Sequence, residues 1–146
     1  MKKLTLKIIT QEKIVLEREI VQATLPIEDG EVTVLADHIP LIGSLHAGEI
    51  KLKDTGGKEE LLAVSGGFVE FHDNTLTLLA DTAERAEEID IERAEAGKKR
   101  AEEVMQSKAD LSEEEYARIA ALLEKELSRL RVAKKHYTKG GLHIES

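Results

Sequence analysis

The stretch TLTLLADTAERAEEIDIERA, residues 75–94, contains the change in composition that decides the fold. Before residue 82, short runs of alternating apolar and polar residues are separated by turn residues, which is typical of an antiparallel sandwich or barrel. After residue 82 the chain is rich in Ala, Glu, Lys, Arg and Leu and contains no proline, which is typical of helix. The sequence therefore predicts a β + α fold, in which an N-terminal antiparallel β-sandwich precedes a C-terminal antiparallel two-helix hairpin.

The sandwich is predicted to occupy residues 1–84, the hairpin residues 88–136, and a flexible tail residues 137–146. Turn signals such as TGG at 55–57 and HDN at 72–74 separate the runs of the first part. The strands are predicted at 4–9, 14–25, 31–35, 49–53, 60–64, 68–71 and 75–79.

The hairpin is predicted from helix start and stop signals. Its first helix is expected over about 90–106, where Asp90 can cap the amides of the first turn. The segment SKADLS, 107–112, interrupts the helical pattern, and Ser112 with Glu115 then forms a capping box at the start of the second helix. Because the connection is short, the two helices are expected to be antiparallel neighbours.

The predicted hairpin has thin apolar stripes and an uneven charge distribution. Its apolar residues bury little area by themselves, so the hairpin is expected to be marginal unless it packs on something larger. Toward its end the second helix carries Glu126 among many cations: Lys125, Arg129, Arg131, Lys134, Lys135 and Lys139. These cations complement the negative end of the helix dipole, or they dock on an acidic surface or on phosphates.

The bulk composition excludes several classes of function. A formal net charge of -8 and an aromatic content of 3% argue against nucleic-acid binding. No apolar run approaches the roughly 18 residues needed to cross a membrane, so no direct membrane insertion is expected. The start MKKLTLKIIT lacks a signal-peptide core, and the lack of cysteine fits a reducing cytoplasm.

The chain also lacks a recognisable catalytic or metal-binding pattern. SGGF at 65–68 is too short for a phosphate-binding P-loop and lacks its lysine, so a turn between strands is the better interpretation. The five histidines have no ligand spacing, and the carboxylates at 113–115 are typical of a solvated face. We therefore expect no enzyme activity, no catalytic cofactor and no metal site.

Four segments resemble the epsilon chain of the rotary F-type ATP synthase. The resemblance covers about residues 2–136, and its second segment is highly specific. The segments are PIEDGEVTVLADHIPLIGSL (26–45), AVSGGFVEFHDNTLTLLAD (63–81), IDIERA (89–94) and RLRVA (129–133).

The resemblance implies a non-catalytic subunit of the central stalk, which couples the catalytic head to the c-ring. The sandwich would bind the gamma shaft and rest on the c-ring, with Glu31 and His38 in the region that faces the ring. The alternative for these two is that they are ordinary exposed loop residues. The complex would transport protons, and this subunit would lie peripherally at the cytoplasmic face of the bacterial cell membrane.

The resemblance also implies that the hairpin is regulatory. Folded down, it would pack on the sandwich. Extended, it would insert beside the shaft into the head of alpha and beta subunits and inhibit ATP hydrolysis, with its basic second helix against acidic segments of beta. A hairpin that must leave its partner cannot be held there by a large core.

Arg93 is unexpected in the first turn of a helix, where a cation faces the positive end of the dipole at a cost of roughly a few tenths of a kcal/mol. The resemblance gives it a role, because I/L-D-x-x-R-A is the nucleotide-binding signature of family members whose hairpin binds ATP without hydrolysing it. The regulatory ligand would be ATP or MgATP. Its nucleoside end would lie near Glu84, Ile89, Asp90, Arg93 and Ala94, and its phosphates near Arg100, Lys125 and Arg129.

One departure from the family pattern concerns Lys125, where the ATP-binding members carry Arg. Lysine keeps the charge but loses the bidentate fork, so the affinity for phosphate is expected to be lower. A site made from both helices exists only in the folded hairpin, so ATP should favour that state. Two alternatives stay open: a purely structural coupling subunit with no ATP sensing, and an independent small enzyme that would show turnover alone.

Overall fold

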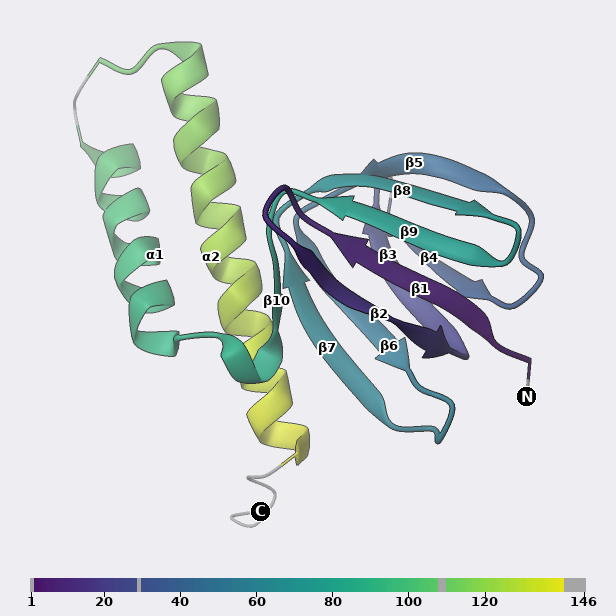
Figure 1. The fold of residues 1–146 in the computed structure, drawn as a ribbon. Coiled ribbons are helices and arrows are strands. Elements are labelled where there is room, and N and C mark those ends of the chain that lie inside the picture. The colour runs from purple at the N-terminus through teal and green to yellow at the C-terminus, as the bar shows by residue number, and fades with distance from the viewer. Residues whose placement is uncertain (1, 29, 108–109, 141–146) are drawn as a thin grey trace.

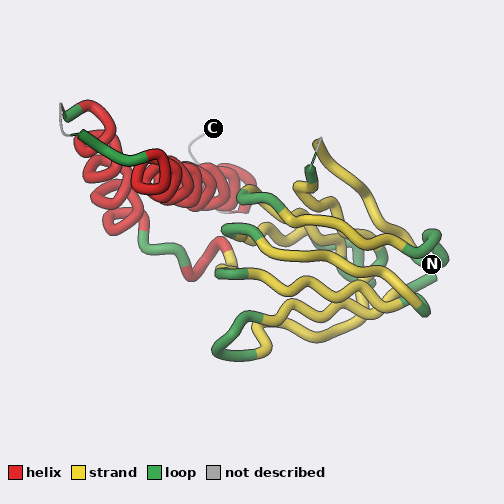
Figure 2. Tube along the Cα trace, turned by 90° about the horizontal axis from the view of Figure 1, so that it is seen from above, coloured by secondary structure: helices red, strands yellow, loops and turns green. Residues whose placement is uncertain are grey.

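The computed structural model describes residues 2–28, 30–107 and 110–140. A β-sandwich forms the N-terminal part, and two helices lie side by side next to it (Figure 1). Seen from above, the strands form a curved, layered body, and the helices lie outside it at one end (Figure 2). The predicted fold class, a β-sandwich followed by a two-helix hairpin, is confirmed.

The sheet contains ten strands within the described residues. Their bounds are β1 Leu4–Ile9, β2 Ile14–Ile20, β3 Gln22–Ile27, β4 Gly30–Leu35, β5 Leu41–Leu45, β6 Gly48–Lys53, β7 Glu59–Val64, β8 Gly67–His72, β9 Thr75–Ala80 and β10 Ala83–Arg85. A short 3-10 helix, η1 (Ala86–Glu88), leads from β10 to the hairpin. The hairpin consists of α1 (Ile91–Gln106) and α2 (Glu113–Gly140).

The strands are hydrogen-bonded in the order β10-β7-β6-β3-β5-β8-β9-β1-β2, and β4 pairs with β3. Most neighbours are antiparallel, but β1 and β9 are parallel, with Leu6 opposite Leu76. These two strands are far apart in the sequence, so no tight turn fixes their relative direction. An ion pair between Arg18 on β2 and Glu60 on β7 links strands from near opposite ends of this order.

The alternation along the strands places one set of side chains in a common core. In β1, Leu4, Leu6 and Ile8 are buried, while the residues between them are partly exposed. This is the period of two that a strand with one covered face requires. Among the described residues, the cluster that contains these side chains draws its members from the sandwich alone. The sandwich therefore has a core of its own, independent of the helices.

The predicted turn at 72–74 joins β8 to β9. Its central residues, Asp73 and Asn74, have φ values of 51° and 58°. Left-handed conformations at both central residues define the two-residue turn that suits the twist of a hairpin. Asn and Asp tolerate this conformation better than most residues, which explains why the motif was a reliable turn signal.

Other strand boundaries differ from the prediction. The predicted strand 14–25 is divided at Val21 into β2 and β3. The strands β5 and β10 were not predicted from the sequence. β5 contains Gly43 and Ser44, which are poor strand formers, yet it pairs with β8 along its whole length. Pairing with a neighbour that is distant in sequence overrides local propensity in such strands.

Both helices begin at the predicted caps. Oδ1 of Asp90 accepts a hydrogen bond of 3.1 Å from the backbone N–H of Arg93. In the capping box, the Ser112 backbone N–H donates to Glu115 at 3.0 Å, and the Glu115 backbone N–H donates to the Ser112 hydroxyl at 3.1 Å. Hydrogen bonds with Ser112 lower the pKa of Glu115; the bond with the backbone has the larger effect and the bond with the side chain the smaller.

α2 ends at Gly140 and thus runs past residue 136, so the predicted start of the flexible tail at residue 137 needs correction. Tyr137 and the two residues after it are acceptable in a helix, whereas glycine costs about 1 kcal/mol there. The helix therefore continues to the first glycine of the segment. The rest of the predicted tail, 141–146, lies outside the described residues.

Small residues on α1 allow the helices to approach each other closely. Ala94, Gly97 and Ala101 are the buried residues of α1. A β-carbon at Gly97 would lie only 2.7 Å from Oε2 of Glu126 on α2. Of the helices described, neither combines the length and the apolar character needed to cross a membrane.

A second, smaller apolar cluster joins α2 to the sandwich. It consists of Leu61, Ala63, Ala86, Ile89, Val132 and Ala133. We call this set the docking cluster. An ion pair between Lys135 on α2 and Glu49 on β6 lies across the same interface. Because the docking cluster is small beside the sandwich core, it adds only modest stability to the closed hairpin.

Candidate functional site

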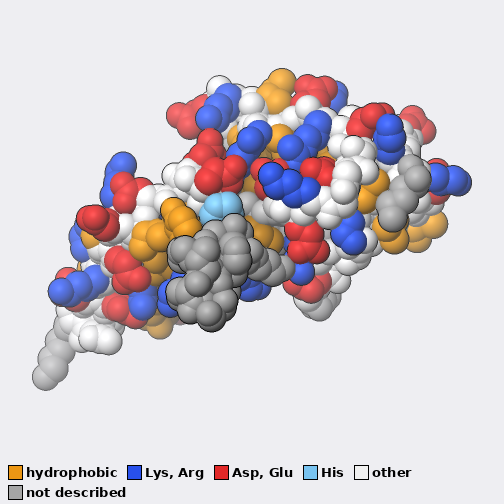
Figure 3. Space-filling view, turned by 90° about the horizontal axis from the view of Figure 1, so that it is seen from below, with side chains coloured by type: hydrophobic (Ala, Val, Ile, Leu, Met, Phe, Trp, Pro, Cys, Tyr) orange, Lys and Arg blue, Asp and Glu red, His pale blue; other side chains and the backbone are white. Residues whose placement is uncertain are grey.

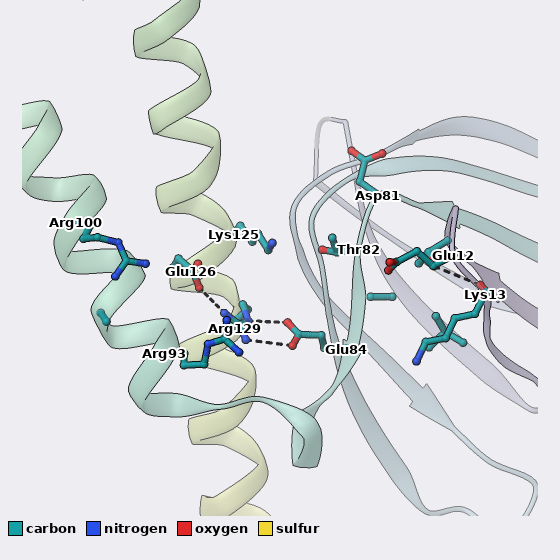
Figure 4. Close-up of a pocket in the computed structure, with 14 residues that line it drawn as sticks. Glu12, Lys13, Asp81, Thr82, Glu84, Arg93, Arg100, Lys125, Glu126 and Arg129 are labelled. Atoms are coloured by element: carbon teal, nitrogen blue, oxygen red, sulfur yellow. Dashed lines mark hydrogen bonds and ion pairs between the residues drawn. The ribbon is translucent and has the colours of Figure 1, made fainter.

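A cleft of about 690 Å³ lies where the hairpin meets the sandwich (Figure 4). We call it the hairpin cleft. One wall comes from the turn between β1 and β2, a second from β10 and the residues just before it, and a third from α1 and α2. The cleft therefore exists only while α2 lies against the sandwich and α1 packs on α2.

Four cations from the two helices line this cleft. Arg93 and Arg100 come from α1, and Lys125 and Arg129 come from α2. The arginines of α1 are two helical turns apart and the cations of α2 one turn apart, so each pair shares one face of its helix. Figure 4 shows all four on the sides of the helices around the cleft. Such a convergence of positive charge is suited to an anion with several negative groups.

Carboxylates also line the cleft, and two of them bind Arg129. Nε of Arg129 donates to Oε1 of Glu84 at 2.6 Å, and Nη2 donates to Oε2 of the same residue at 3.1 Å. Nη1 of Arg129 donates to Oε1 of Glu126 at 2.8 Å. The first contact joins α2 to β10, and the second lies within α2.

The pKa of Arg129 reflects these partners. Partial burial by itself lowers the pKa, but hydrogen bonds to Glu126 and Glu84, with their negative charges, outweigh burial and leave it raised. Arg129 is therefore a permanent cation held by two carboxylates. Any external anion must compete with them or share the guanidinium.

The structure gathers five of the eight predicted ATP-site residues at the hairpin cleft: Glu84, Arg93, Arg100, Lys125 and Arg129.

The other three predicted residues do not line the cleft. Ile89 is buried in the docking cluster. Asp90 caps α1 by accepting from the backbone of Arg93. Ala94 is fully buried on α1. In this structure these three residues shape the start of α1, and so help to set where Arg93 lies.

Residues of the sandwich that were not predicted from the sequence also line the cleft. Lys13 and Glu12 come from the turn between β1 and β2, and Asp81 and Thr82 come from the link between β9 and β10. Glu12 and Lys13 lie about eighty residues before α1, and Asp81 and Thr82 directly follow β9, so no local sequence pattern links any of them to the helices. Only the folded arrangement brings them to one place.

Glu31 and His38, predicted to face the c-ring, both lie in the sandwich. Glu31 is exposed on β4, opposite Pro26 of β3. Nδ1 of His38 lies 2.7 Å from the carbonyl oxygen of Ile39, and the rings of His38 and Phe71 are nearly perpendicular, with centroids 5.9 Å apart. His38 is thus held in a defined orientation in the segment between β4 and β5, and Ile39 beside it is exposed.

Large apolar side chains are exposed on three neighbouring strands, β5, β8 and β9. They are Ile42, Phe68 and Leu79, exposed by 82%, 63% and 50%. Phe68 lies directly opposite Leu79 on β9, and Ile42 lies two positions from the β5 residue that faces Phe68. We call these three residues the outer apolar row. Adjacent exposed apolar residues of this size are typical of an interaction surface.

Elsewhere the surface is mixed in charge. On the face seen from below, acidic and basic side chains are interspersed over both the sandwich and the hairpin (Figure 3). Within the described residues, no three potential ligands are grouped closely enough to hold a metal ion. The hairpin cleft and the outer apolar row are therefore the features that point most directly to binding.

Comparison with known families divides the chain between two matches. Residues 3–86 match the family described as ATP synthase, Delta/Epsilon chain, beta-sandwich domain. Residues 87–134 match the family described as ATP synthase, Delta/Epsilon chain, long alpha-helix domain.

Individual proteins give the same result. A protein of Desulforamulus reducens named ATP synthase epsilon chain is 43% identical over 128 residues, which are 88% of this chain and 95% of the relative. A protein of Bacillus pumilus with the same name is 36% identical over 135 residues, 92% of this chain and 100% of the relative. Among solved structures, a chain of the Euglena gracilis mitochondrial ATP synthase, in an OSCP/F1/c-ring structure, matches with a TM-score of 0.77 and 25% identity. That match covers 90% of this chain and 81% of the other.

Proposed function

This chain belongs to the delta/epsilon chain family of the ATP synthase, and from this premise we propose that it is a central-stalk subunit whose hairpin binds ATP and inhibits ATP hydrolysis when it extends. Its relatives are epsilon chains, which are non-catalytic subunits of the complex. The proposal therefore assigns the chain a coupling and regulatory role and no turnover of its own.

One observation carries the ATP-binding part of the proposal. Cations of both helices converge on the hairpin cleft, and they include Arg93 of the signature IDIERA. A triphosphate has the multiple negative groups that such an arrangement favours. Because the cleft needs both helices, bound ATP would stabilise the closed hairpin by its differential affinity for that state.

The size of the docking cluster supports a hairpin that can open. Its members from α2 are Val132 and Ala133, which offer far less apolar area than a domain core. Full burial of a side chain such as valine contributes about 1.5 kcal/mol or slightly more. A contact of this kind can be exchanged for contacts with another partner, as an inhibitory extension into the catalytic head of alpha and beta subunits requires.

The outer apolar row supports the proposed contact of the sandwich with the gamma shaft. Ile42, Phe68 and Leu79 give an apolar surface on one side of β5, β8 and β9. We place the c-ring contact at Glu31, His38 and the exposed Ile39 beside them. Through the ring, the subunit would be peripheral at the cytoplasmic face of the bacterial membrane, in a proton-transporting complex.

A structural coupling subunit without ATP sensing is the second candidate, and two features of the cleft favour it. Arg129 already has two carboxylate partners in the closed hairpin, and lysine stands at 125 where a fork-shaped arginine would bind phosphate better. This candidate keeps the same fold and partners, so ATP binding alone separates the two.

Calorimetry of the full chain with ATP, with and without Mg²⁺, tests the proposal. We expect the wild type to bind, and Arg93→Ala and Arg100→Ala each to lower the affinity at least about tenfold, or roughly 1.4 kcal/mol. Lys99→Ala is the matched control, because Lys99 is an exposed cation of α1 beside Arg100 that does not line the cleft. Equal binding in all four proteins, or none in the wild type, would reject ATP sensing at this cleft.

A further inference from the structure

The two carboxylate partners of Arg129 differ in where they come from. Glu126 is on the same helix as Arg129, three residues earlier, so this pair travels with α2. Its side chain lies against Gly97 of α1, where a β-carbon would be 2.7 Å from Oε2. Glu84 is on β10, so its contact with Arg129 exists only while the hairpin lies against the sandwich.

The contact with Glu84 occupies one edge of the guanidinium completely. Nε and Nη2 form that edge, and each donates to a different oxygen of the Glu84 carboxylate. A phosphate group would use the same pair of donors, because phosphate and carboxylate both match the spacing of the fork. The remaining Nη1 donates to Glu126. A phosphate therefore cannot take the Nε–Nη2 edge until Glu84 leaves it.

The pair is also well placed to hold the hairpin closed. The side chains of Arg129 and Glu84 are exposed by only 14% and 29%, so water screens their attraction less than it screens a surface pair. The contact joins the middle of α2 to the strand that precedes the hairpin, and it adds to the docking cluster farther along α2.

We propose that Glu84 is an internal competitor at the hairpin cleft: its carboxylate occupies the edge of Arg129 that would bind phosphate, and it thereby latches the hairpin to the sandwich when no nucleotide is bound. The inference rests on the proposed function for the identity of its ligand. ATP binding then replaces the ion pair between Glu84 and Arg129 by an ion pair between a phosphate and Arg129. ATP therefore stabilises the closed hairpin only by the difference in free energy between these two interactions.

This assignment gives Glu84→Gln two opposite effects. Without nucleotide, loss of the charge weakens the latch, so the ratio of closed to open hairpin falls by up to about fivefold, the upper range for a partly exposed ion pair. With ATP, the freed guanidinium binds phosphate better, so the intrinsic affinity rises at least about threefold. If Glu84 instead contacts the nucleoside, the same change lowers the affinity.

The closed fraction can be measured by spin-label distances in the full chain. The chain has no cysteine, so labels can be attached at cysteines introduced at Thr55 in the β6–β7 turn and Ala117 near the start of α2, both exposed. The apparent dissociation constant for ATP, multiplied by the closed fraction, gives the intrinsic constant. Asp81→Asn is the charge-matched control, because Asp81 lines the same cleft and its side chain has no bond with Arg129 among those described.

We expect nucleotide-free Glu84→Gln to have a lower closed fraction and a smaller intrinsic dissociation constant for ATP than wild type. Asp81→Asn should leave the closed fraction unchanged and should alter the affinity for ATP less than Glu84→Gln does. An unchanged closed fraction, or a larger intrinsic dissociation constant for ATP in Glu84→Gln, overturns the inference but does not contradict the proposed ATP binding. If no form binds ATP, the proposed function and the competitor role fail together. The nucleotide-free distances then show whether the latch alone exists.

Discussion

Val132→Ala should open the hairpin without touching the hairpin cleft. Val132 is completely buried in the docking cluster, where α2 meets Leu61 and Ala63 of β7. The change removes two methyl groups, each worth about 0.8 kcal/mol when buried, so the closed state loses about 1.6 kcal/mol before any cavity term. That loss lowers the ratio of closed to open hairpin about fifteenfold.

The helical preference of alanine does not obscure this effect. Replacing valine by alanine stabilises a helix by roughly 0.5 kcal/mol, but the gain applies to open and closed states alike while α2 stays helical. Val104→Ala on α1 is the matched control, since Val104 is substantially exposed and lies outside the docking cluster. It carries the same gain in helical preference without the lost contact.

The assay is the distance between labels on the sandwich and on α2, followed by ATP hydrolysis of the assembled enzyme. We expect Val132→Ala to shift the distances to the open population and, under the proposed function, to lower hydrolysis through stronger inhibition. Val104→Ala should leave both readouts close to wild type. Equal closed fractions in the two variants would refute the conclusion that the docking cluster holds the hairpin down.

Three further predictions concern other parts of the chain. Hydrogen bonding lowers the folded-state pKa of Glu115, so the stability from its capping box is present above the unshifted pKa of 4.5 and is lost as the pH falls through that value and below it. Circular dichroism at decreasing pH should show this loss in wild type and little of it in Glu115→Gln. Identical curves for the two proteins would contradict the assignment. Under the proposed function, Phe68→Asp in the outer apolar row should weaken binding to the gamma subunit at least about tenfold. Thr55→Asp in an exposed turn should not weaken it, and a pull-down with gamma measures both. A chain ending at residue 87 should stay folded by circular dichroism, because the sandwich core is separate from the helices; an unfolded fragment would disprove the independence of the two parts. Under the proposed function, the same truncation should raise ATP hydrolysis in the assembled enzyme.

Features encoded by neighbouring residues were predictable from the sequence. Strand alternation gave β1 and β9, and cap residues gave the starts of α1 and α2. The strands β5 and β10 were not predictable, because their short or glycine-containing sequences become strands only through pairing with β8 and β7. The parallel pairing of β1 with β9 was missed for the same reason.

The candidate site shows the same division between local and long-range information. The motif IDIERA singled out Arg93, and the resemblance supplied Arg100 of α1 and Lys125 and Arg129 of α2, all of which line the cleft. Lys13 could not be predicted, because a turn between two strands carries no signal that it will face a helix so distant in sequence. The double pairing of Arg129 was equally hidden, since the sequence does not reveal which carboxylate a cation will meet.

Single contacts between the hairpin and the sandwich have energies comparable with those that a bound ligand supplies. The apolar contact of Val132 contributes about 1.6 kcal/mol, and a partly exposed pair such as Glu84 with Arg129 adds up to about 1 kcal/mol. A ligand that binds only the closed state stabilises it by about 2.7 kcal/mol at a hundred times its dissociation constant. Under the proposed function, ATP at roughly fourteen times its dissociation constant would therefore restore the closed-state stability, about 1.6 kcal/mol, that Val132→Ala removes. A hairpin held by a full domain core could not be regulated by a ligand of this strength, so the small docking cluster is a requirement of the proposed switch.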